Sequence, residues 1–461
     1  KMFKNEVAEF IYKRTYSRWL EDENRREDWP ETIERLITFL ISKRPDIPDK
    51  TIIKLRKYML EFAVMPSMRF LWAAGPAADF DNTCIYNCAF AKINSIEAFS
   101  ECLYILMCGT GFGFSVEQEE VMKLPEVPEI KSGQGLPKIT LKDSKAGWAD
   151  SVKILMGSLY DGQNIYFNYS KIRPEGARLK TMGGRASGPL PLIKLHDFIR
   201  QTMHNAQGRK LTPLEAHDIC NQIAEIVVVG GVRRSSQISL SDLDDKNMRH
   251  AKDWPYPIKR AMANNSAIYK DKPSAAQFLK EWGSLALSGT GERGIFNLSA
   301  AQSKAPSRRY APLIQGTNPC GEIMLRDMQF CNLSEIVVKP NDDLDTLLDK
   351  AETAAWMGVI QSTFTNFPYL RKDWKKNCEI ERLLGVSLTG QMDNPSLMNS
   401  EALKALKSRV LRISRKASGI LGVHTPAATT CVKPSGTVSQ LVDSASGVHP
   451  RYAKHYIRRF R

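Results

Sequence analysis

The sequence predicts an α/β fold for most of the chain, preceded by a shorter helical region. From residue 64 onward, apolar runs typical of strands alternate with stretches of helical periodicity, and Gly-rich turns separate them. The strand-like runs are FGFSVE, QNIYFNYSKI, RRSSQISLS, NNSAIYK, GIFNLS and NLSEIVV. Because strands that alternate with helices are typical of α/β architectures, we expect one such domain over residues 64–461.

Helical periodicity dominates residues 1–63. In PETIERLITFLISKR, apolar side chains recur at helical spacing at Ile33, Leu36, Leu40 and Ile41, and DKTIIKLRKYMLEF repeats the pattern. Further along, SKAGWADSVKILMGSLYDG carries the same kind of apolar stripe. We therefore expect a helical N-terminal region at 1–63 and a helix that begins shortly after residue 143.

The composition is that of a large globular protein of the cytoplasm. Hydrophobic residues make up 43% of the chain, and no apolar run approaches the ~20 residues of a membrane span. The N-terminus is charged throughout and lacks the apolar segment of a signal peptide. The nine cysteines are an odd number, so we expect thiols rather than a disulfide framework. No CxxC is paired with a second one, so no metal site is expected.

The formal net charge of +15 indicates an anionic partner. The basic residues are scattered, apart from RYAKHYIRRFR near residue 461, and no signature of a nucleic-acid-binding fold is present. Polyphosphorylated small molecules explain the charge equally well. A basic nucleic-acid-binding protein with core cysteines stays open as the alternative function.

The segment TNPCGEIMLRDMQFCNLSE has the residues best suited to catalysis. Asn318, Cys320 and Glu322 alternate, so in extended chain their side chains point the same way. Pro319 and Gly321, which lie between them, are disfavoured in the interior of a β-strand, so we expect a loop rather than a strand. A carboxylate neighbour raises the pKa of a thiol, which disfavours a thiolate nucleophile. A neutral thiol that exchanges hydrogen atoms, beside a carboxylate base, fits radical chemistry on a polyhydroxylated substrate.

Three glycine-containing segments are candidate binding loops. In GTGFGFS the alternating glycines, among them Gly111, leave one strand face bare, either for a ligand or for tight packing. KPSGTVS can present backbone N–H groups and hydroxyls to a phosphate, or simply cap a helix. In 172–192, Arg173 and Arg178 lie among glycines that include Gly183 and Gly184, as in a loop that reorders around phosphates.

These segments together resemble the ribonucleotide reductase family. NPCGEI, with Cys331 eleven positions after Cys320, resembles the finger loop of its cobalamin-dependent (class II) members. The other matching segments, in order, are MPSMRFLWAAG, YNCAF, GTGFGFSVE, DSKAGWADSV, IRPEGARLKTMGGRASGPLPL and KPSGTVS. The resemblance covers about 65 to 461 and implies reduction of ribonucleoside di- or triphosphates to deoxyribonucleotides for DNA replication.

The resemblance also implies a role for individual residues. Cys320 would carry the thiyl radical, Glu322 would be the base for the 3′-hydroxyl, and Asn318 would bind the ribose hydroxyls. Cys88 and Cys331 would be the redox-active pair that ends as a disulfide, with Cys84 as the rival of Cys88. Substrate would be bound by Ser67, Gly111, Pro434, Ser435, Gly436 and Thr437. A deoxynucleotide or ATP effector would be bound by Asp143, Ser144, Arg173 and Arg178, as in an allosteric enzyme.

The same family implies a ten-stranded α/β barrel around a central finger loop. The chain ends 24 residues after Thr437, where the family usually continues, so either the C-terminal end of the barrel is incomplete or the protein is an unusually compact relative of the class II or class I enzymes. The radical source is either adenosylcobalamin or a di-metal centre in a separate ferritin-like subunit, and the sequence leaves this undecided. The chain itself would bind metal only as Mg²⁺ on nucleotide phosphates. Expected partners are a thioredoxin- or glutaredoxin-like reductant, a radical-generating subunit if the second source applies, and a second copy in a homodimer.

Overall fold

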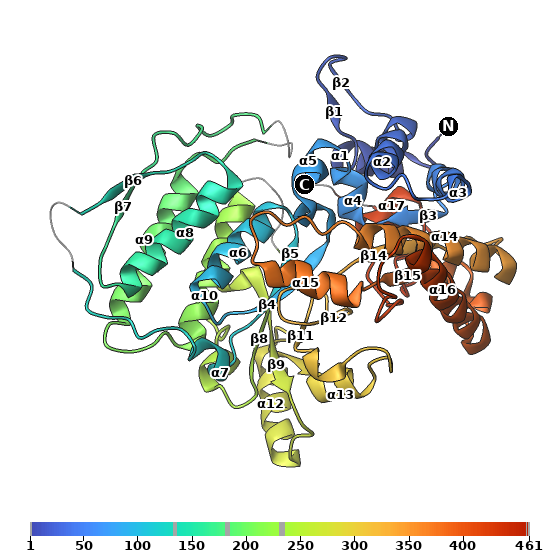
Figure 1. Ribbon diagram of the computed structural model, residues 1–461. Coiled ribbons are helices and arrows are strands. Elements are labelled where there is room, and N and C mark those ends of the chain that lie inside the picture. The colour runs from blue at the N-terminus through green and yellow to red at the C-terminus, as the bar shows by residue number, and fades with distance from the viewer. Residues whose placement is uncertain (1, 132–135, 180–184, 230–235, 458, 460–461) are drawn as a thin grey trace. The chain divides into compact units, whose positions relative to one another are not determined.

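The computed structural model describes residues 2–131, 136–179, 185–229, 236–457 and 459, and shows a mixed α/β fold (Figure 1). The chain divides into two compact units. The first unit contains Lys1–Asn87, Cys331–Asn366 and Lys375–Arg461. The second contains Cys88–Phe330 and Phe367–Trp374. The expected boundary at 63/64 runs inside the first unit.

The first unit combines helices with a three-stranded sheet. Its sheet has the order β15-β14-β3, from β3 (Val64–Pro66), β14 (Leu333–Val337) and β15 (Gly385–Thr389). Strand β14 pairs parallel with β15 and antiparallel with β3. Its helices are α1 (Glu6–Thr15), α2 (Trp29–Lys43), α3 (Asp49–Leu60), α4 (Met68–Ala73), α5 (Pro76–Phe80), α14 (Leu344–Ser362), α16 (Ser400–Ile420) and α17 (Thr437–Leu441). The hairpin β1 (Trp19–Leu20) with β2 (Arg25–Arg26), and the 3-10 turns η1 (Asn82–Ile85), η4 (Gln391–Asp393) and η5 (Pro395–Leu397), complete it.

Helix α2 shows why the N-terminal segment is helical. Asp28 caps its first turn in a capping box with Glu31, and a proline occupies the first turn. Ile33, Leu36 and Leu40 are fully buried, as the helical spacing predicts. Ile41, assigned to the same stripe, is 46% exposed because it lies beyond the edge of the buried face.

The second unit is built on a six-stranded sheet in the order β10-β9-β8-β5-β4-β13. Its strands are β4 (Cys88–Lys92), β5 (Gly111–Ser115), β8 (Gln237–Asp242), β9 (Ala263–Tyr269), β10 (Gly294–Asn297) and β13 (Gln329–Phe330). All neighbours pair in parallel except β13, which pairs antiparallel with β4. Short pairs form between β6 (Lys138–Thr140) and β7 (Tyr166–Asn168), and between β11 (Gly316–Thr317) and β12 (Met324–Leu325).

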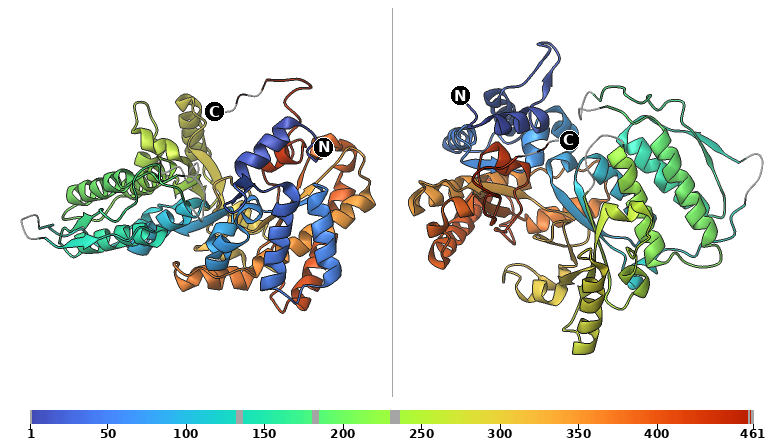
Figure 2. Two further views of the ribbon diagram at one scale, coloured as in Figure 1. Left: turned by 90° about the horizontal axis from the view of Figure 1, so that it is seen from above. Right: turned by 180° about the vertical axis from the view of Figure 1, so that it is seen from behind.

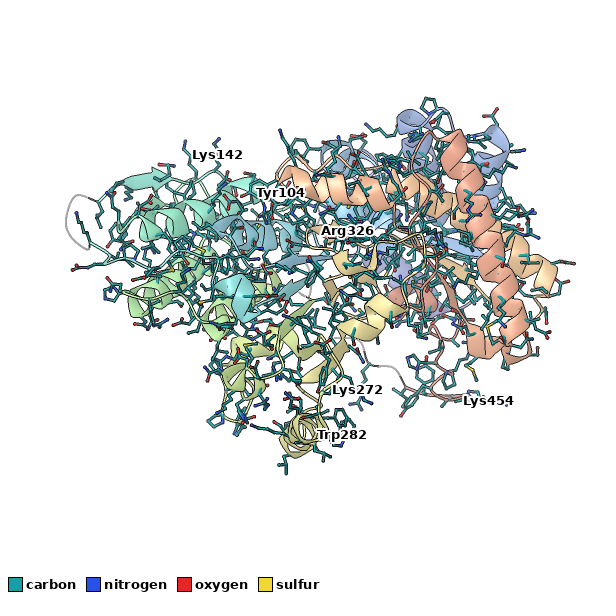
Figure 3. The ribbon with its side chains drawn as sticks, turned by 60° about the horizontal axis from the view of Figure 1, so that its bottom comes forward. Tyr104, Lys142, Lys272, Trp282, Arg326 and Lys454 are labelled. Atoms are coloured by element: carbon teal, nitrogen blue, oxygen red, sulfur yellow. The ribbon has the colours of Figure 1, made fainter. Side chains whose placement is uncertain are left out.

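The helices of the second unit are α6 (Ile96–Met107), α7 (Gln118–Val121), α8 (Lys145–Tyr160), α9 (Leu190–Asn205), α10 (Pro213–Val229), α11 (Lys246–Arg249), α12 (Ala275–Ser288) and α13 (Leu298–Ser303), with turns η2 (Ile258–Met262) and η3 (Ala311–Leu313). Helix α15 (Lys372–Glu381) begins in this unit and continues into the first. Helices α8 and α9 lie side by side, and α6 and α10 pack with them (Figures 1 and 2). Helix α12 buries Glu281 against Arg249 and Arg293, while its Trp282 is exposed (Figure 3).

The expected closed ten-stranded barrel is not confirmed. The described strands form open sheets, of which the largest has six members, with β10 and β13 at its edges. Closing a barrel requires each edge strand to find a partner, and the two-residue β13 offers little ladder for one. Across the residues that the structure describes, no helix is long and apolar enough to cross a membrane.

Candidate active site

The segment 316–325 forms a finger in the second unit. Strands β11 and β12 pair antiparallel, with Thr317 opposite Met324, and the tip between them is a loop, as predicted. Asn318 closes this loop: its N–H donates to the carbonyl of Ile323, and its Oδ1 accepts from the Ile323 N–H at 3.0 Å. The fold of the finger therefore depends on the residue expected to bind substrate.

The finger lies against bare backbone on strand β5 and against the ring of Phe90 on strand β4. A Cβ atom on Gly113 would overlap the carbonyl oxygen of Thr317, and one on Gly316 would overlap the ring of Phe90. A Cβ on Gly111 would lie 3.3 Å from Pro319 Cγ and 3.4 Å from Cys88 Sγ. Of the two interpretations of GTGFGFS, the structure therefore shows the packing one, and the group packed there is the finger itself.

The tip of the finger presents polar groups that the protein leaves without partners. Asn318 is fully buried, and its amide Nδ2 has no hydrogen-bond partner in the structure. Glu322 is half-buried, and its Oε2 is a buried atom that also has no partner. Leaving buried polar atoms unsatisfied is costly, so such groups indicate a site for a polar ligand. Cys320 is exposed, and Gly321 has a left-handed φ of 85° with no atom within 4 Å of its Cβ position.

The redox candidates lie at the ends of paired strands. Antiparallel β13 and β4 pair Phe330 with Ala89. Cys331 directly follows the last residue of β13, and Cys88 is the first residue of β4, next to Ala89. Just before β13, within the segment LRDMQ, Met328 has a φ of 52°. Cys84 instead is buried in η1, where its Sγ donates to the carbonyl of Asp81 at 3.1 Å.

The first unit contains the candidate phosphate loop 434–437. Ser435 is fully buried and its hydroxyl donates to Glu335 Oε2 at 2.9 Å. The hydroxyl of Thr437 lies 2.7 Å from that of Tyr16. Gly436 is exposed, with a φ of 60° and its Cβ position 3.7 Å from Met68 Sδ. The hydroxyls therefore anchor the loop, and Pro434 and Gly436 form its exposed part.

Ser67 is also engaged by the protein. Its hydroxyl accepts from the N–H of Phe70 at 3.0 Å, which caps α4, and donates to the carbonyl of Ile85 at 2.8 Å. Its own N–H donates to Gln361 Oε1 at 3.1 Å. Sequence reasoning missed Gln361, Tyr16 and Glu335; only Glu335 had a signal, because a carboxylate in the middle of the apolar run NLSEIVV is unusual.

Three of the four candidate effector residues, Asp143, Ser144 and Arg173, lie together at the start of α8. Ser144 is the N-cap of this helix and accepts from the N–H of Gly147 at 3.0 Å. Asp143, expected to bind the effector, accepts from Arg173 Nε at 2.6 Å. Arg178 forms a single antiparallel bridge with Arg185. Gly183 and Gly184, expected in the same loop, lie outside the described residues.

Burial and hydrogen bonding decide the electrostatics of these sites. Burial raises the pKa of Glu335 above its usual value, although the ammonium of Lys433 and the Ser435 hydroxyl act in the opposite direction. In the described part of the chain, no group of three or more His, Cys, Asp or Glu side chains is placed to hold a metal ion. The finger itself offers a thiol, an amide and a carboxylate, from Cys320, Asn318 and Glu322.

Comparison with known proteins points to one family. A model described as the ribonucleotide reductase alpha domain matches residues 1–76, and one described as the insertion domain of B12-dependent ribonucleotide reductase matches residues 130–203. An adenosylcobalamin-dependent ribonucleoside-triphosphate reductase of Levilactobacillus brevis is 27% identical over 99% of this chain and 74% of its own length. The enzyme of that name from Lactobacillus leichmannii is 28% identical over 98% of this chain and 74% of its own length.

Solved structures agree with these relatives. A B12-dependent (class II) ribonucleotide reductase matches with a TM-score of 0.82 and 25% identity, over 98% of this chain and 76% of the other. The class Id ribonucleotide reductase alpha subunit of Actinobacillus ureae matches with a TM-score of 0.60 at 13% identity, over 97% and 75% of the two chains. The second match is evidence for the fold alone.

Proposed function

We infer that this chain is a ribonucleotide reductase catalytic subunit, an oxidoreductase that converts ribonucleotides to 2′-deoxyribonucleotides. The family models, the named relatives and the class II structure all support this function. The structural observation that carries it is the finger, whose one loop contains the exposed Cys320 and the polar atoms of Asn318 and Glu322 that have no partner among the described residues. The alternative, a basic nucleic-acid-binding protein with core cysteines, is not supported.

The proposed chemistry assigns a step to each residue of the finger. As a thiyl radical, Cys320 takes the 3′-hydrogen atom of the ribose, and Glu322 accepts the proton of the 3′-hydroxyl. The amide of Asn318 binds the ribose hydroxyls through its unpartnered Nδ2. The 2′-hydroxyl leaves as water, Cys88 and Cys331 supply two electrons and two hydrogens, and they become a disulfide. Cys320 then returns the hydrogen atom to C3′, so the radical is not consumed.

We propose adenosylcobalamin as the radical source. When bound, it supplies an organic radical close to a thiol. The residues present fit such a group: Cys320 is exposed, and the open space at Gly321 lets a bulky molecule approach the thiol. The B12-dependent family model and the adenosylcobalamin-dependent relatives support this source. Nothing supports the ferritin-like subunit as an alternative.

The substrate is proposed to be a ribonucleoside triphosphate, as the names of the relatives suggest. Its phosphates would lie at Pro434–Thr437, where the loop is anchored from behind by Tyr16 and Glu335. Ser67, next to Met68 at this loop, and Gly111, beneath the finger, would support binding through their backbone positions. The five parallel strands of the second unit would form one half of the family barrel.

Asp143, Ser144, Arg173 and Arg178 are proposed as the site for a deoxynucleoside triphosphate or ATP effector. They lie within the residues that match the insertion domain of B12-dependent reductases. Arg173 would exchange its ion pair with Asp143 for the effector's phosphates, because guanidinium groups bind phosphate and carboxylate alike. A thioredoxin- or glutaredoxin-like protein would reduce the disulfide of Cys88 and Cys331 back to thiols. A homodimer remains an expectation from the sequence.

Disulfide mapping after one turnover tests the proposed redox pair. The reduced protein is given adenosylcobalamin and a ribonucleoside triphosphate without external reductant, then alkylated and digested. We expect Cys88 and Cys331 in one disulfide-linked peptide, since Cys88 begins β4 and Cys331 directly follows β13, which pairs with β4. Cys84→Ser, which removes the neighbouring buried thiol, should give the same linkage. A disulfide between Cys84 and Cys331 would transfer the role to Cys84.

A further inference from the structure

Glu335 lies where a buried sheet normally has an apolar residue. It is the middle residue of β14, the central strand of the three-stranded sheet, and all five residues of this strand are buried. Only 1% of Glu335 is exposed. Burying a carboxylate costs free energy unless it is paired or protonated, so its presence at this position calls for a function.

The carboxyl group of Glu335 contacts the candidate phosphate loop. Its Oε2 accepts the hydroxyl hydrogen of Ser435 at 2.9 Å, and Ser435 is itself fully buried. Its Oε1 is buried and has no hydrogen-bond partner in the structure. A neutral carboxyl group tolerates this arrangement far better than a carboxylate, which would keep an unsatisfied charge in the core.

Lys433 is the cation that acts electrostatically on this carboxyl group. Its side chain is only 5% exposed, and among the described residues its ammonium forms no hydrogen bond or ion pair. The strands that flank β14, β3 and β15, have no ionisable side chain. Helix α14 also packs on β14, but its charged groups are engaged or exposed: Lys350 pairs with Asp342, Asp349 with Lys54, Glu352 with Arg409, and Asp345 is in solvent.

We propose that Glu335 is a positioning residue of the substrate-phosphate loop, which as a neutral carboxyl group fixes Ser435 and leaves the Lys433 ammonium available to bind phosphate. This inference rests on the proposed function of residues 434–437. When Glu335 ionises, its carboxylate attracts the ammonium of Lys433 and repels the phosphate. The raised pKa that burial gives Glu335 keeps the neutral form present to higher pH than in an ordinary glutamate.

Nucleotide binding to the purified chain tests this role without turnover. The dissociation constants of cytidine triphosphate and of cytidine, which has no phosphate, are measured by calorimetry from about pH 6 to about pH 9. Three variants are compared with the unmodified chain: Glu335→Gln, which is neutral and nearly isosteric, Lys433→Met, and Glu401→Gln as a control. Glu401 lies in the exposed first turn of α16. Circular dichroism confirms that each variant is folded.

The triphosphate should bind the unmodified chain progressively more weakly than Glu335→Gln as the pH rises. Phosphate ionisation is the same for both proteins, so the ratio of their dissociation constants isolates Glu335. Lys433→Met should lose about tenfold in triphosphate affinity at every pH, as expected for one charge-assisted hydrogen bond, with cytidine affinity unchanged. Glu401→Gln should match the unmodified chain.

Two results would overturn the inference while leaving the reductase function intact: a pH-independent ratio for Glu335→Gln, or unchanged triphosphate affinity in Lys433→Met. If the unmodified chain binds cytidine and cytidine triphosphate equally, the phosphate loop itself is wrongly assigned. That outcome rejects this part of the proposed function together with the inference.

Discussion

Gly113 is the residue on which the finger depends most directly. Its missing side chain lets the carbonyl of Thr317 approach the backbone of β5, and any Cβ would overlap that oxygen. Gly113→Ala should therefore lower the free energy of unfolding by about 1–3 kcal/mol, because backbone cannot move aside as a flexible side chain can. It should also displace the finger and reduce activity.

Gly157 provides the matched control for this substitution. It lies in helix α8, and no atom is within 4 Å of its Cβ position. Gly157→Ala should leave stability unchanged or raise it by about 0.5–1 kcal/mol, since alanine favours helix. Calorimetry gives the stability of both variants, and hydrogen exchange at the Ile323 N–H reports on the finger. Equal stability and equal exchange in the two variants would show that the contact at Gly113 does not matter.

For single residues, the sequence predicted which side chains belong to the candidate site better than it predicted what those side chains contact. The alternation of Asn318, Cys320 and Glu322 correctly predicted a polar loop. The hydroxyls of Ser67, Ser435 and Thr437 were predicted to face phosphate, yet they bond to Ile85, Glu335 and Tyr16. These partners lie up to 421 positions away in the chain. Local patterns carry no information about such distant contacts, so a hydroxyl anchored in the core looks like one offered to a ligand.

Helices α8 and α9 are joined by a buried histidine. His196 on α9 lies 2.7 Å from the hydroxyl of Ser151 on α8 and 2.7 Å from the hydroxyl of Tyr169. Ser151 donates to the carbonyl of Trp148, so it accepts from Nε2–H, and Tyr169 donates to Nδ1. Burial lowers the pKa of His196 from 6.5 to about 3, with a further contribution from Arg200. The ring is therefore neutral at physiological pH.

This histidine should make the stability of the chain depend on pH. Its folded pKa lies below the unfolded value, so its contribution is complete above about pH 6.5 and is lost as the pH falls toward 3. At pH 5 the loss should be on the order of 2 kcal/mol, from 1.36 kcal/mol per pH unit. His196→Gln should remove the contribution of His196 to this pH dependence. The free energy of unfolding, measured between pH 5 and pH 7, would detect the change.

His204 on the same helix is exposed and provides the control, because His204→Gln should leave the pH dependence of unfolding unchanged. His217, also buried with its pKa lowered to about 3, should keep part of the dependence in both variants. Identical pH profiles for His196→Gln and the unmodified chain would contradict the neutral, buried state of this ring.

Among the elements, periodicity predicted the helices more reliably than it predicted the sheets. Helix α8 begins where the sequence placed it, with Val152, Leu155 and Leu159 buried. The strand-like runs RRSSQISLS and NLSEIVV contain β8 and β14, but their order and their partners could not be read from periodicity. Strand pairing is set by contacts between segments far apart in sequence, and for this reason the expected ten-stranded barrel is not confirmed while the α/β class is.

For the whole molecule, the positive net charge is consistent with the proposed function. A charge of +15 without a nucleic-acid-binding motif suits an enzyme whose substrates and effectors carry several phosphates. The two candidate nucleotide sites, one at Pro434–Thr437 and one at Asp143–Arg178, each have a cation close at hand, Lys433 and Arg173. In the proposed function, these two cations would supply the phosphate affinity that scattered charge alone would not.

The central claim is that Cys320 performs radical reduction of a ribonucleotide with adenosylcobalamin as the radical source. The most direct measurement is formation of 2′-deoxycytidine triphosphate from cytidine triphosphate in the presence of dithiothreitol. The unmodified chain should form the deoxynucleotide only when adenosylcobalamin is added. Cys320→Ser, nearly isosteric at an exposed position, should stay folded, bind cytidine triphosphate and form none. Deoxynucleotide formed by Cys320→Ser, or by the unmodified chain without adenosylcobalamin, would contradict the account.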